Sequence, residues 1–553
     1  WNIDPVTGSG WPAREKWWRI DIRSDDRLSD VKWVWEAGRH RDVVVLARAS
    51  ALDPAGAWLA ELEAMLRAWV AQCSPERGVH WYSSLELALR SIAWAQMLEL
   101  VGDRLDQGLR RQLEVQLLAS ARHIMLELPY TVSSMKNNHL LGDGLGLVVI
   151  GRLFPGHAAS QRWRRLGDAI FLKQLDRHMR ADGSMIEDSL SYHRFVLEML
   201  IVRVLIGGAD PAVRRALADA SMHLRGLGAL DGDVPQYGDW DEGRVLADSA
   251  PAGSVAGSAL AGLALTGRSV DAQAWVDHDE LAWYVASDQA DKPLEPLDPV
   301  RVSGDFQIVE KGPWRVWFKV TSGPSHQHAD VSSVWIQREG RWLIREQGTG
   351  TYNGPIEVRN AFRTSIAHPV WHPEGVDQLI PHRAFRWLRS VRGYAAAPHR
   401  HEDAVVLFGW HDAFELEDTS CRVARAVVVR DVSVTVIDFI EEPGQQAWVL
   451  TVPTGGSQTT DFFGLEEAEL VSGSASPFLG WFSETYGTWE PSPWLVRNTF
   501  SQLEIWGVGQ APRIVRGSPA TVDDVQVSVI WEPNAATFCL DGARSLRLEV
   551  RRG

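Results

Sequence analysis

The strongest constraint on the fold is a change in residue pattern near residue 300. From residue 30 to about 287, apolar residues recur every three or four positions, as Leu62, Leu66 and Trp69 do. This is the spacing of an amphipathic helix. Later segments such as 314–320 are rich in β-branched and aromatic residues, which indicates strands. The pattern therefore predicts a helical half followed by an antiparallel β half.

The chain is also too long for a single core, since it has 553 residues. Short breakers separate the predicted helices, and many helical hairpins in series predict an α/α toroid over residues 1–287. Residues 288–300 contain three prolines and several charges, so they are predicted to be a linker. Residues 301–553 are predicted to form an antiparallel β-sandwich, which makes the fold an α+β multidomain arrangement.

Composition and missing motifs exclude several function classes. The net charge is −15, which disfavours general binding of nucleic acid or anionic membranes. No apolar run is long enough to predict a membrane span. The three scattered cysteines form neither a disulfide framework nor a zinc knuckle. The sequence contains no glycine-rich phosphate loop, GxSxG elbow or HExxH helix, which disfavours nucleotide, α/β-hydrolase and zincin chemistry. The 27 tryptophans fit either sugar stacking or core packing.

Two polar clusters open predicted helices. Asn137, Asn138 and His139 stand before an apolar run, where they could bind an anion with help from the helix dipole or simply cap the helix. Tyr192 and His193 stand early in an amphipathic stretch. From position alone, a tyrosine there is more often a packed core residue than a functional one.

Two further segments offer candidate substrate-binding side chains. Trp81 precedes a predicted helix that carries Glu86 and Arg90, whose spacing of four is typical of an ion pair. Tyr237 lies in the loop Gln-Tyr-Gly-Asp-Trp-Asp, whose acids could orient cations or cap a helix.

A His-x-His-x-Asp sequence is the strongest local signal. It comprises His326, His328 and Asp330 and leads into an expected strand over 331–337. Residues two apart share one face of a strand, so these three side chains could converge as a zinc set. The arginines Arg359 and Arg363 follow, which fits capture of an anionic ligand as well as a solvated sheet edge.

Taken in order, these motifs resemble those of the heparinase II/III-like polysaccharide lyases, which are related to oligoalginate lyases. The ordered set is Asn-Asn-His-Leu-Leu, Asp-Gly-Ser-x-x-Glu-x-Ser-x-x-Tyr-His, His-x-His-x-Asp, Glu-x-Gly-x-x-x-Tyr and Arg-Thr-x-x-x-His. It covers the chain from about residue 32 to about 375. The family's toroid and β-sandwich match the fold expected from the residue pattern.

The resemblance implies β-elimination at a uronic acid of an acidic polysaccharide, glycosaminoglycan-like or a bacterial exopolysaccharide, leaving a 4,5-unsaturated uronate. It implies that Asn138 and His139 neutralise the substrate carboxylate, and that Tyr192 gives or takes a proton. His326 then acts as base or as charge neutraliser. The candidate substrate-binding residues are Asn137, His193, Glu86, Arg90, Trp81, Tyr237, Arg359 and Arg363.

The resemblance also implies a structural zinc ion held by His328, Glu346 and His368, and no organic cofactor. Two departures from the family pattern are Glu346, where Asp is more common, and Pro369 after His368. A polymeric substrate favours a periplasmic or secreted protein. Two alternatives stay open: a non-catalytic polysaccharide-binding protein, and a glycoside hydrolase using Glu187 with Asp239 or Asp241.

Overall fold

The structure is a computed structural model, and its chain divides into two compact units. The first unit comprises Trp1–Met185, Tyr192–Met222 and Gly243–Leu294, and the second comprises Ile186–Ser191, His223–Glu242 and Glu295–Gly553. The structure describes the whole chain except residues 23–28, 248–252, 269, 272, 286–292, 322–325, 390, 417–418, 443–446, 457–460, 517–518, 524, 533–534, 541–543 and 550–553.

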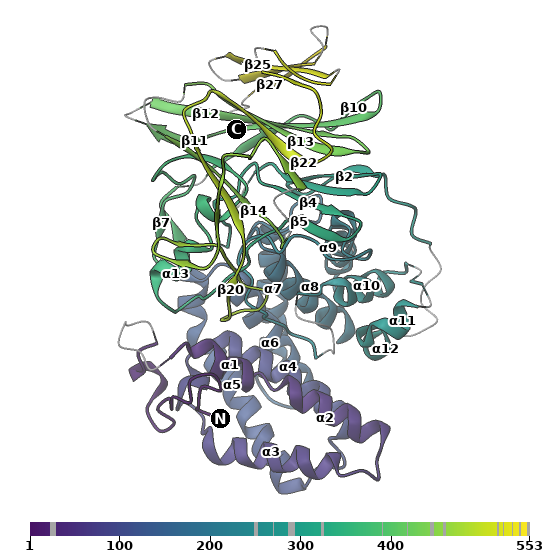
Figure 1. Cartoon of the computed structure of the whole chain (residues 1–553). Helices are drawn as coiled ribbons and strands as arrows, with labels where there is room; N and C mark the ends of the chain where they lie inside the picture. The colour runs from purple at the N-terminus through teal and green to yellow at the C-terminus, as the bar shows by residue number, and fades with distance from the viewer. Residues whose placement is uncertain are drawn as a thin grey trace. The chain divides into compact units, whose positions relative to one another are not determined.

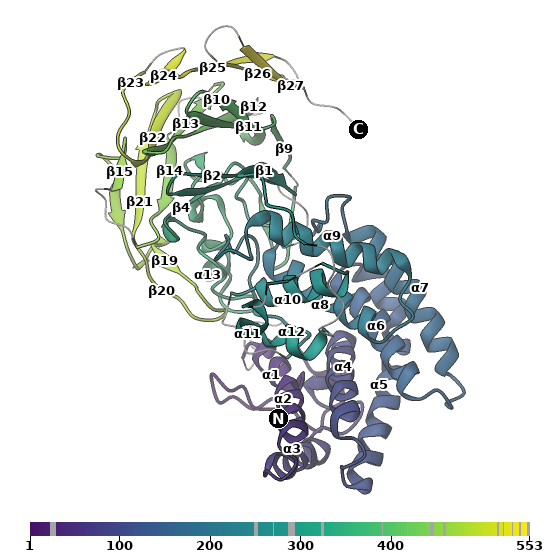
Figure 2. The ribbon, with the colours of Figure 1, turned by 90° about the vertical axis from the view of Figure 1, so that its right-hand side faces the viewer.

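The first unit is helical (Figures 1 and 2). Its helices, some of which extend into the second unit, are α1 (Val31–Gly38), α2 (Arg41–Leu52), α3 (Trp58–Gln72), α4 (Ser84–Val101), α5 (Gln107–Ser134), α6 (Asn138–Leu153), α7 (Ser160–His178), α8 (Leu190–Leu205), α9 (Pro211–Leu227), α10 (Ala256–Leu265), α11 (Ala274–Asp277) and α12 (Asp279–Tyr284), with 3-10 turns η1 (Trp17–Arg19) and η2 (Val79–Trp81).

Apolar stripes and caps explain these helices. On α3, Leu62, Leu66 and Trp69 are fully buried, as their spacing predicts. Asp106 caps α5 by accepting a hydrogen bond from the Leu109 amide at 2.9 Å. Asn137 caps α6 in the same way, because its side chain accepts a hydrogen bond from the His139 amide. Capping was one of the two roles expected for Asn137 from its position before an apolar run.

The second unit is built from antiparallel sheets. One sheet has the order β1-β2-β3-β4-β5, and a larger one the order β10-β11-β12-β13-β22-β15, with β9 also paired to β11. Their strands are β1 (Val300–Ser303), β2 (Phe306–Lys311), β3 (Trp314–Lys319), β4 (Val334–Arg338), β5 (Arg341–Ile344), β9 (Gly393–Ala395), β10 (His399–His401), β11 (Ala404–Leu416), β12 (Thr419–Val429), β13 (Ser433–Ile440), β15 (Phe462–Phe463) and β22 (Leu503–Gly509).

Smaller sheets and one short helix complete the second unit. The sheet β16-β21-β14-β6 comprises Glu469–Val471, Trp494–Thr499, Trp448–Pro453 and Trp371–Pro373, and the sheet β23 to β27 comprises Ile514–Val515, Ala520–Val522, Val525–Glu532, Ala535–Leu540 and Arg544–Glu549. The two-stranded pairs are β7 (Pro381–His382) with β8 (Arg386–Trp387), β17 (Ser474–Ala475) with β18 (Phe478–Leu479), and β19 (Trp481–Phe482) with β20 (Glu490–Pro491), while α13 spans Ile356–Ala361 and a 3-10 turn η3 spans Ser365–Ala367.

The predicted order of a helical region followed by antiparallel sheets is confirmed. The domain boundaries at 287 and 300 stay a prediction, and residues 288–292 of the expected linker lie outside the described residues. Within the residues that the structure describes, no helix combines the length and apolar character needed to cross a membrane.

Candidate functional site

The site in the second unit centres on two loops. The first is 236–241, and the second runs from His326 to Ser333 between β3 and β4. The expectation that His326, His328 and Asp330 lie on a strand was wrong, because β4 begins only at Val334. The two histidines converge for another reason: both imidazoles contact the Asp239 carboxylate of the first loop.

Gly238 determines where Asp239 lies. The backbone at Gly238 has φ +68°, in the left-handed region that favours glycine. A Cβ there would lie 2.2 Å from the Asp188 carbonyl oxygen and 2.9 Å from that of His326. This close approach lets the Asp239 amide donate a 2.8 Å hydrogen bond to the His326 carbonyl. The two loops are thus joined by backbone as well as by side chains.

Asp239 holds three cationic or imidazole groups. Its Oδ2 lies 3.0 Å from His326 Nδ1, and its Oδ1 lies 3.3 Å from His328 Nε2. Arg359 Nη2 donates to Oδ2 at 2.7 Å. Asp239 and His328 are fully buried, and Arg359 is nearly so. Asp239 therefore connects the predicted catalytic histidine to a predicted metal ligand.

Asp239 is held ionised. Burial alone would raise the pKa of this carboxyl, but the Arg359 guanidinium and the hydrogen bonds from the two histidines outweigh burial, so its pKa lies well below the usual range. An ionised carboxylate accepts but cannot donate hydrogen bonds. His326 must then carry a proton on Nδ1 to bond with Asp239, so in the neutral imidazole Nε2 is the nitrogen that can accept one.

Glu187 lies on the other side of the His326 ring. Its Oε2 is 3.9 Å from His326 Nε2, and its carbonyl accepts the His326 amide at 3.2 Å. His326 itself is about 6% exposed. The imidazole is therefore placed between two carboxylates, one facing each ring nitrogen.

The three predicted metal ligands are brought together. Suitable donor atoms of His328, Glu346 and His368 all lie within 4.8 Å of one another, and the three residues are buried. Glu346 Oε1 lies 3.2 Å from His368 Nδ1 and 3.7 Å from His328 Nδ1. The longer arm of Glu346 thus still reaches both imidazoles.

The donor set fits a metal ion such as zinc. Among the described residues, His328 Nδ1, both Glu346 carboxylate oxygens and both His368 ring nitrogens are buried without a hydrogen-bond partner. Such orphaned atoms are costly unless another group satisfies them. Because His328 contacts Asp239 through Nε2, its Nδ1 is left for a metal, which is the usual carboxylate–histidine–metal arrangement.

Asp330 does not join this group. Both of its oxygens lie 2.8 Å from Lys319 Nζ, and the same ammonium contacts Asp188 Oδ2 at 2.9 Å. All three side chains are buried. Burial alone would lower the pKa of Lys319, but the two carboxylates raise it above its ordinary value. This cluster fixes the Asp188 backbone, which borders Gly238 and follows Glu187.

The Arg363 guanidinium is held by hydrogen bonds to nearby residues of the second unit. It donates to Asn360 Oδ1 at 2.9 Å and to the carbonyls of Ala384 at 2.8 Å and Arg383 at 2.6 Å. Its guanidinium lies 4.5 Å from the centre of the Trp387 ring. These contacts show a structural role, while a role in substrate binding stays a prediction.

Arg359 and Tyr237 each pack against aromatic rings of the second unit. The Arg359 guanidinium lies 5.0 Å from the ring centre of Tyr352 and 5.9 Å from that of Phe385. Tyr237 is buried, with its ring 4.7 Å from that of Phe306.

The remaining predicted site residues belong to the first unit. Asn138 is buried at the start of α6, whereas His139 is only half-buried. Tyr192 is half-buried early in α8. His193 is buried and its Nε2 lies 3.1 Å from the Ala220 carbonyl. Burial lowers the pKa of His193 to about 4, so the imidazole is neutral at pH 7.

Glu86 and Arg90 do not form the hydrogen-bonded pair that their spacing suggested. Glu86 accepts two 2.8 Å hydrogen bonds from Arg39, and Arg90 donates to the carbonyls of Gly38 and His80. The reason is that the guanidinium of Arg39, at the C-terminal end of α1, binds both carboxylate oxygens of Glu86. Trp81 is buried in η2. Substrate contacts by these three residues stay a prediction.

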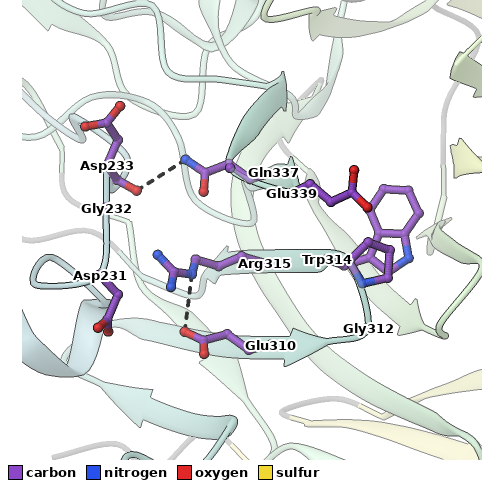
Figure 3. Close-up of a pocket in the computed structure, with 11 residues that line it drawn as sticks. Asp231, Gly232, Asp233, Glu310, Gly312, Trp314, Arg315, Gln337 and Glu339 are labelled. Carbon is purple, nitrogen blue, oxygen red and sulfur yellow. Dashed lines mark hydrogen bonds and ion pairs between the residues drawn. The ribbon is translucent and has the colours of Figure 1, made fainter.

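A separate pocket lies along β2, β3 and β4 of the second unit (Figure 3). Asp231, Asp233, Glu310 and Glu339 line it, and Arg315 forms an ion pair with Glu310 at 3.3 Å. Its surplus of carboxylates would repel an acidic polysaccharide, and none of the predicted site residues lines it.

Comparisons with known proteins assign the family. The description "Heparinase II/III N-terminus" matches residues 15–209, and "Heparinase II/III-like, C-terminal" matches residues 293–488. The chain belongs to the heparinase II/III-like family. This family comprises polysaccharide lyases, as the ordered motifs implied. No curated protein sequence matches the chain significantly.

Solved structures with the same fold are distant in sequence. A crystal structure of heparinase III is 13% identical, with a TM-score of 0.61, and the match covers 96% of this chain and 86% of that one. The heparan sulfate lyase HepC from Pedobacter heparinus is 13% identical, with a TM-score of 0.53 and coverages of 97% and 85%. The chondroitin AC lyase of Streptomyces coelicolor A3 is 11% identical, with a TM-score of 0.53 and coverages of 91% and 83%. At this identity the likeness shows the fold alone.

Proposed function

We propose that this family member is an active lyase that cleaves a uronic-acid polysaccharide by β-elimination. The observation that carries the proposal is the His326–Asp239 pair, in which a buried carboxylate orients an imidazole. Such a pair sets the histidine tautomer and leaves Nε2 able to take or hold a proton. An orienting carboxylate of this kind is common in acid–base catalysis.

The reaction requires three tasks. The substrate carboxylate must be neutralised so that the C5 proton becomes acidic, a base must remove that proton, and an acid must protonate the leaving 4-oxygen. In this proposal Asn138 and His139 bind the carboxylate. Tyr192 and His326 share the two proton transfers, and the epimer at C5 decides which of them is the base.

The metal group has a supporting role in the proposal. His328, Glu346 and His368 would hold a zinc ion, with Asp239 orienting His328 from outside the ligand set. Held by these residues, a buried structural zinc would fix the loop that carries His326 and would take no part in the chemistry.

The state of Asp239 disfavours this residue as the acid of a hydrolase, while the alternative with Asp241 stays open. A hydrolase needs a carboxylic acid that can donate a proton to the leaving oxygen. Asp239 is fully buried, held ionised and bonded to three side chains, so it cannot do this. The non-catalytic alternative rested on the Glu346 and Pro369 departures, but Glu346 still lies beside both histidines.

The test is incubation of the purified protein with a panel of uronic-acid polysaccharides. A lyase produces ultraviolet absorbance from the unsaturated uronate, and Tyr192→Phe should abolish it while leaving thermal unfolding unchanged. Reducing ends without absorbance would mean hydrolysis. Binding without either product would favour the non-catalytic alternative.

A further inference from the structure

An aromatic cluster of the second unit takes no part in the proposed chemistry. It consists of Phe362, which follows α13, together with Phe478, Trp481 and Trp489 of the segment that contains β17 to β20. Figure 1 shows β20 beside α13, and α13 also packs against β18. We call these four residues the aromatic platform.

The platform has a buried base and an exposed top. Phe478 stacks on Trp481 with ring centres 5.1 Å apart, and Trp489 stands edge-on to Phe478 at 6.3 Å. Phe362 lies 6.5 Å from Trp489 and is 1% exposed, whereas Trp489 is 37% exposed. The buried Phe362 ring and the half-buried Phe478 ring therefore hold the Trp489 indole in a defined orientation at the surface.

The segment that carries the platform is bonded to the metal-ligand segment. After Glu346 the chain runs beside residues 483–487, where the Ser483 amide donates to the Gln347 carbonyl at 2.9 Å and the Gly487 amide to that of Gly350 at 3.1 Å. The Tyr352 amide donates to the Tyr486 hydroxyl at 3.0 Å. The platform thus adjoins the candidate site through backbone bonds.

The chemistry of the platform fits a sugar ring. A flat, partly exposed indole offers a large apolar face, and the C–H face of a pyranose is the surface that stacks on it. Two exposed carboxylates, Glu484 and Glu490, flank Trp489 in sequence. These charges would repel a sulfate group or a uronate carboxylate, so an uncharged ring of the polymer fits best.

We propose that Trp489, supported by Phe362 and Phe478, is a sugar-binding platform that holds an uncharged, unsulfated ring of the polysaccharide beside the candidate site. This inference rests on the proposed function only in taking a uronic-acid polysaccharide as the ligand. It assigns Trp489 to binding and not to proton transfer.

The test measures binding of hyaluronan and of chemically desulfated heparan sulfate by calorimetry, in the Tyr192→Phe background so that the polymer stays intact. Trp489→Ala should weaken binding of at least one of them about tenfold, or about 1.4 kcal/mol. Phe500→Ala is the matched control, because Phe500 is an exposed aromatic of the same unit, at 72% exposure, outside the platform. It should bind as tightly as its parent.

Several results would overturn the platform. The first is that Trp489→Ala binds the polymers as tightly as its parent, and the second is that Trp489→Ala and Phe500→Ala lose affinity equally. The third is that the parent binds neither polymer, and the fourth is that a changed oligomeric state of Trp489→Ala accounts for its loss of affinity. The lyase proposal is read separately from absorbance in the unmutated protein. If the unmutated protein turns over substrate but binding does not depend on Trp489, the platform alone is rejected. If binding depends on Trp489 but there is no turnover, the lyase proposal alone is rejected.

Discussion

The carboxylate of Asp239 lies 3.0 Å from Nδ1 of His326, across 87 residues of sequence. The same carboxylate contacts His328 and Arg359, so the candidate catalytic histidine, a candidate metal ligand and a buried arginine depend on one side chain. Removing its charge should therefore affect catalysis, metal affinity and stability together.

Asp239→Asn should lower kcat about 100-fold, because an amide cannot hold both imidazoles and the guanidinium. It should also destabilise the fold by about 3–5 kcal/mol, since Arg359 would be left as a buried unpaired charge. Steady-state kinetics and denaturant unfolding measure the two effects. Asp231→Asn, an exposed acid upstream of the same loop, is the control and should behave as the unmutated protein. Full activity in Asp239→Asn would remove this residue from the site.

The metal group yields a prediction with a readout besides activity. The purified protein should contain about one zinc per chain by elemental analysis, and a chelator should lower its melting temperature. Glu346→Gln should weaken zinc binding, because a neutral amide is a poorer ligand than a carboxylate. Glu339→Gln changes an exposed glutamate of the same unit and should retain the metal. The site would be contradicted if the purified protein contained no zinc and neither a chelator nor added zinc changed its melting temperature.

A buried acid of the first unit predicts a dependence of stability on pH. Asp143 on α6 is fully buried, and burial raises its pKa to about 7, although the nearby Ser84 and Thr131 hydroxyls oppose this in part. A carboxyl whose pKa is raised on folding binds its proton more tightly in the folded state. Its contribution to stability is therefore greatest below pH 4 and is lost as pH rises from about 4 to 7.

Asp143→Asn should remove this loss, because an amide does not ionise. The stability difference between variant and parent should grow from pH 4 to pH 7 by up to about 4 kcal/mol, from a shift of about three pKa units. Urea unfolding at several pH values measures it. Asp176→Asn, an exposed acid on α7, should follow the unmutated curve. A constant difference across the range would mean that Asp143 is not protonated in the fold.

Much of the fold follows from local patterns. The spacing of Leu62, Leu66 and Trp69 predicts α3 because burial of one helix face is a property of neighbours three and four apart. The segment 314–320 likewise predicts β3, which spans Trp314–Lys319. These predictions need no knowledge of distant contacts.

The site was only partly predictable, because its geometry depends on distant contacts. His328, Glu346 and His368 were identified through a resemblance and do converge. Asp239 was identified only as an acid of a loop and as a candidate hydrolase carboxylate, not as the partner of His326, since its partners lie 87 to 120 residues away. The Asp330 hypothesis failed because Lys319, at the end of β3, supplies a stronger partner. The glycine that precedes Asp239 was the local signal of a tightly packed turn.

That glycine yields the last prediction. Gly238 and Gly340 both have positive φ, at +68° and +77°, so alanine at either position costs about 1–2 kcal/mol of backbone strain. Around Gly340 nothing lies within 4 Å of the added Cβ, whereas at Gly238 it would meet two carbonyl oxygens closer than 3.0 Å. Gly238→Ala should therefore cost a further 1–3 kcal/mol or so and displace Asp239 from His326. Denaturant unfolding should show the larger loss in Gly238→Ala, and kinetics should show at least a tenfold fall in kcat there and none in Gly340→Ala. Equal behaviour of the two variants would mean that the loop tolerates the methyl group and that Asp239 does not depend on this turn.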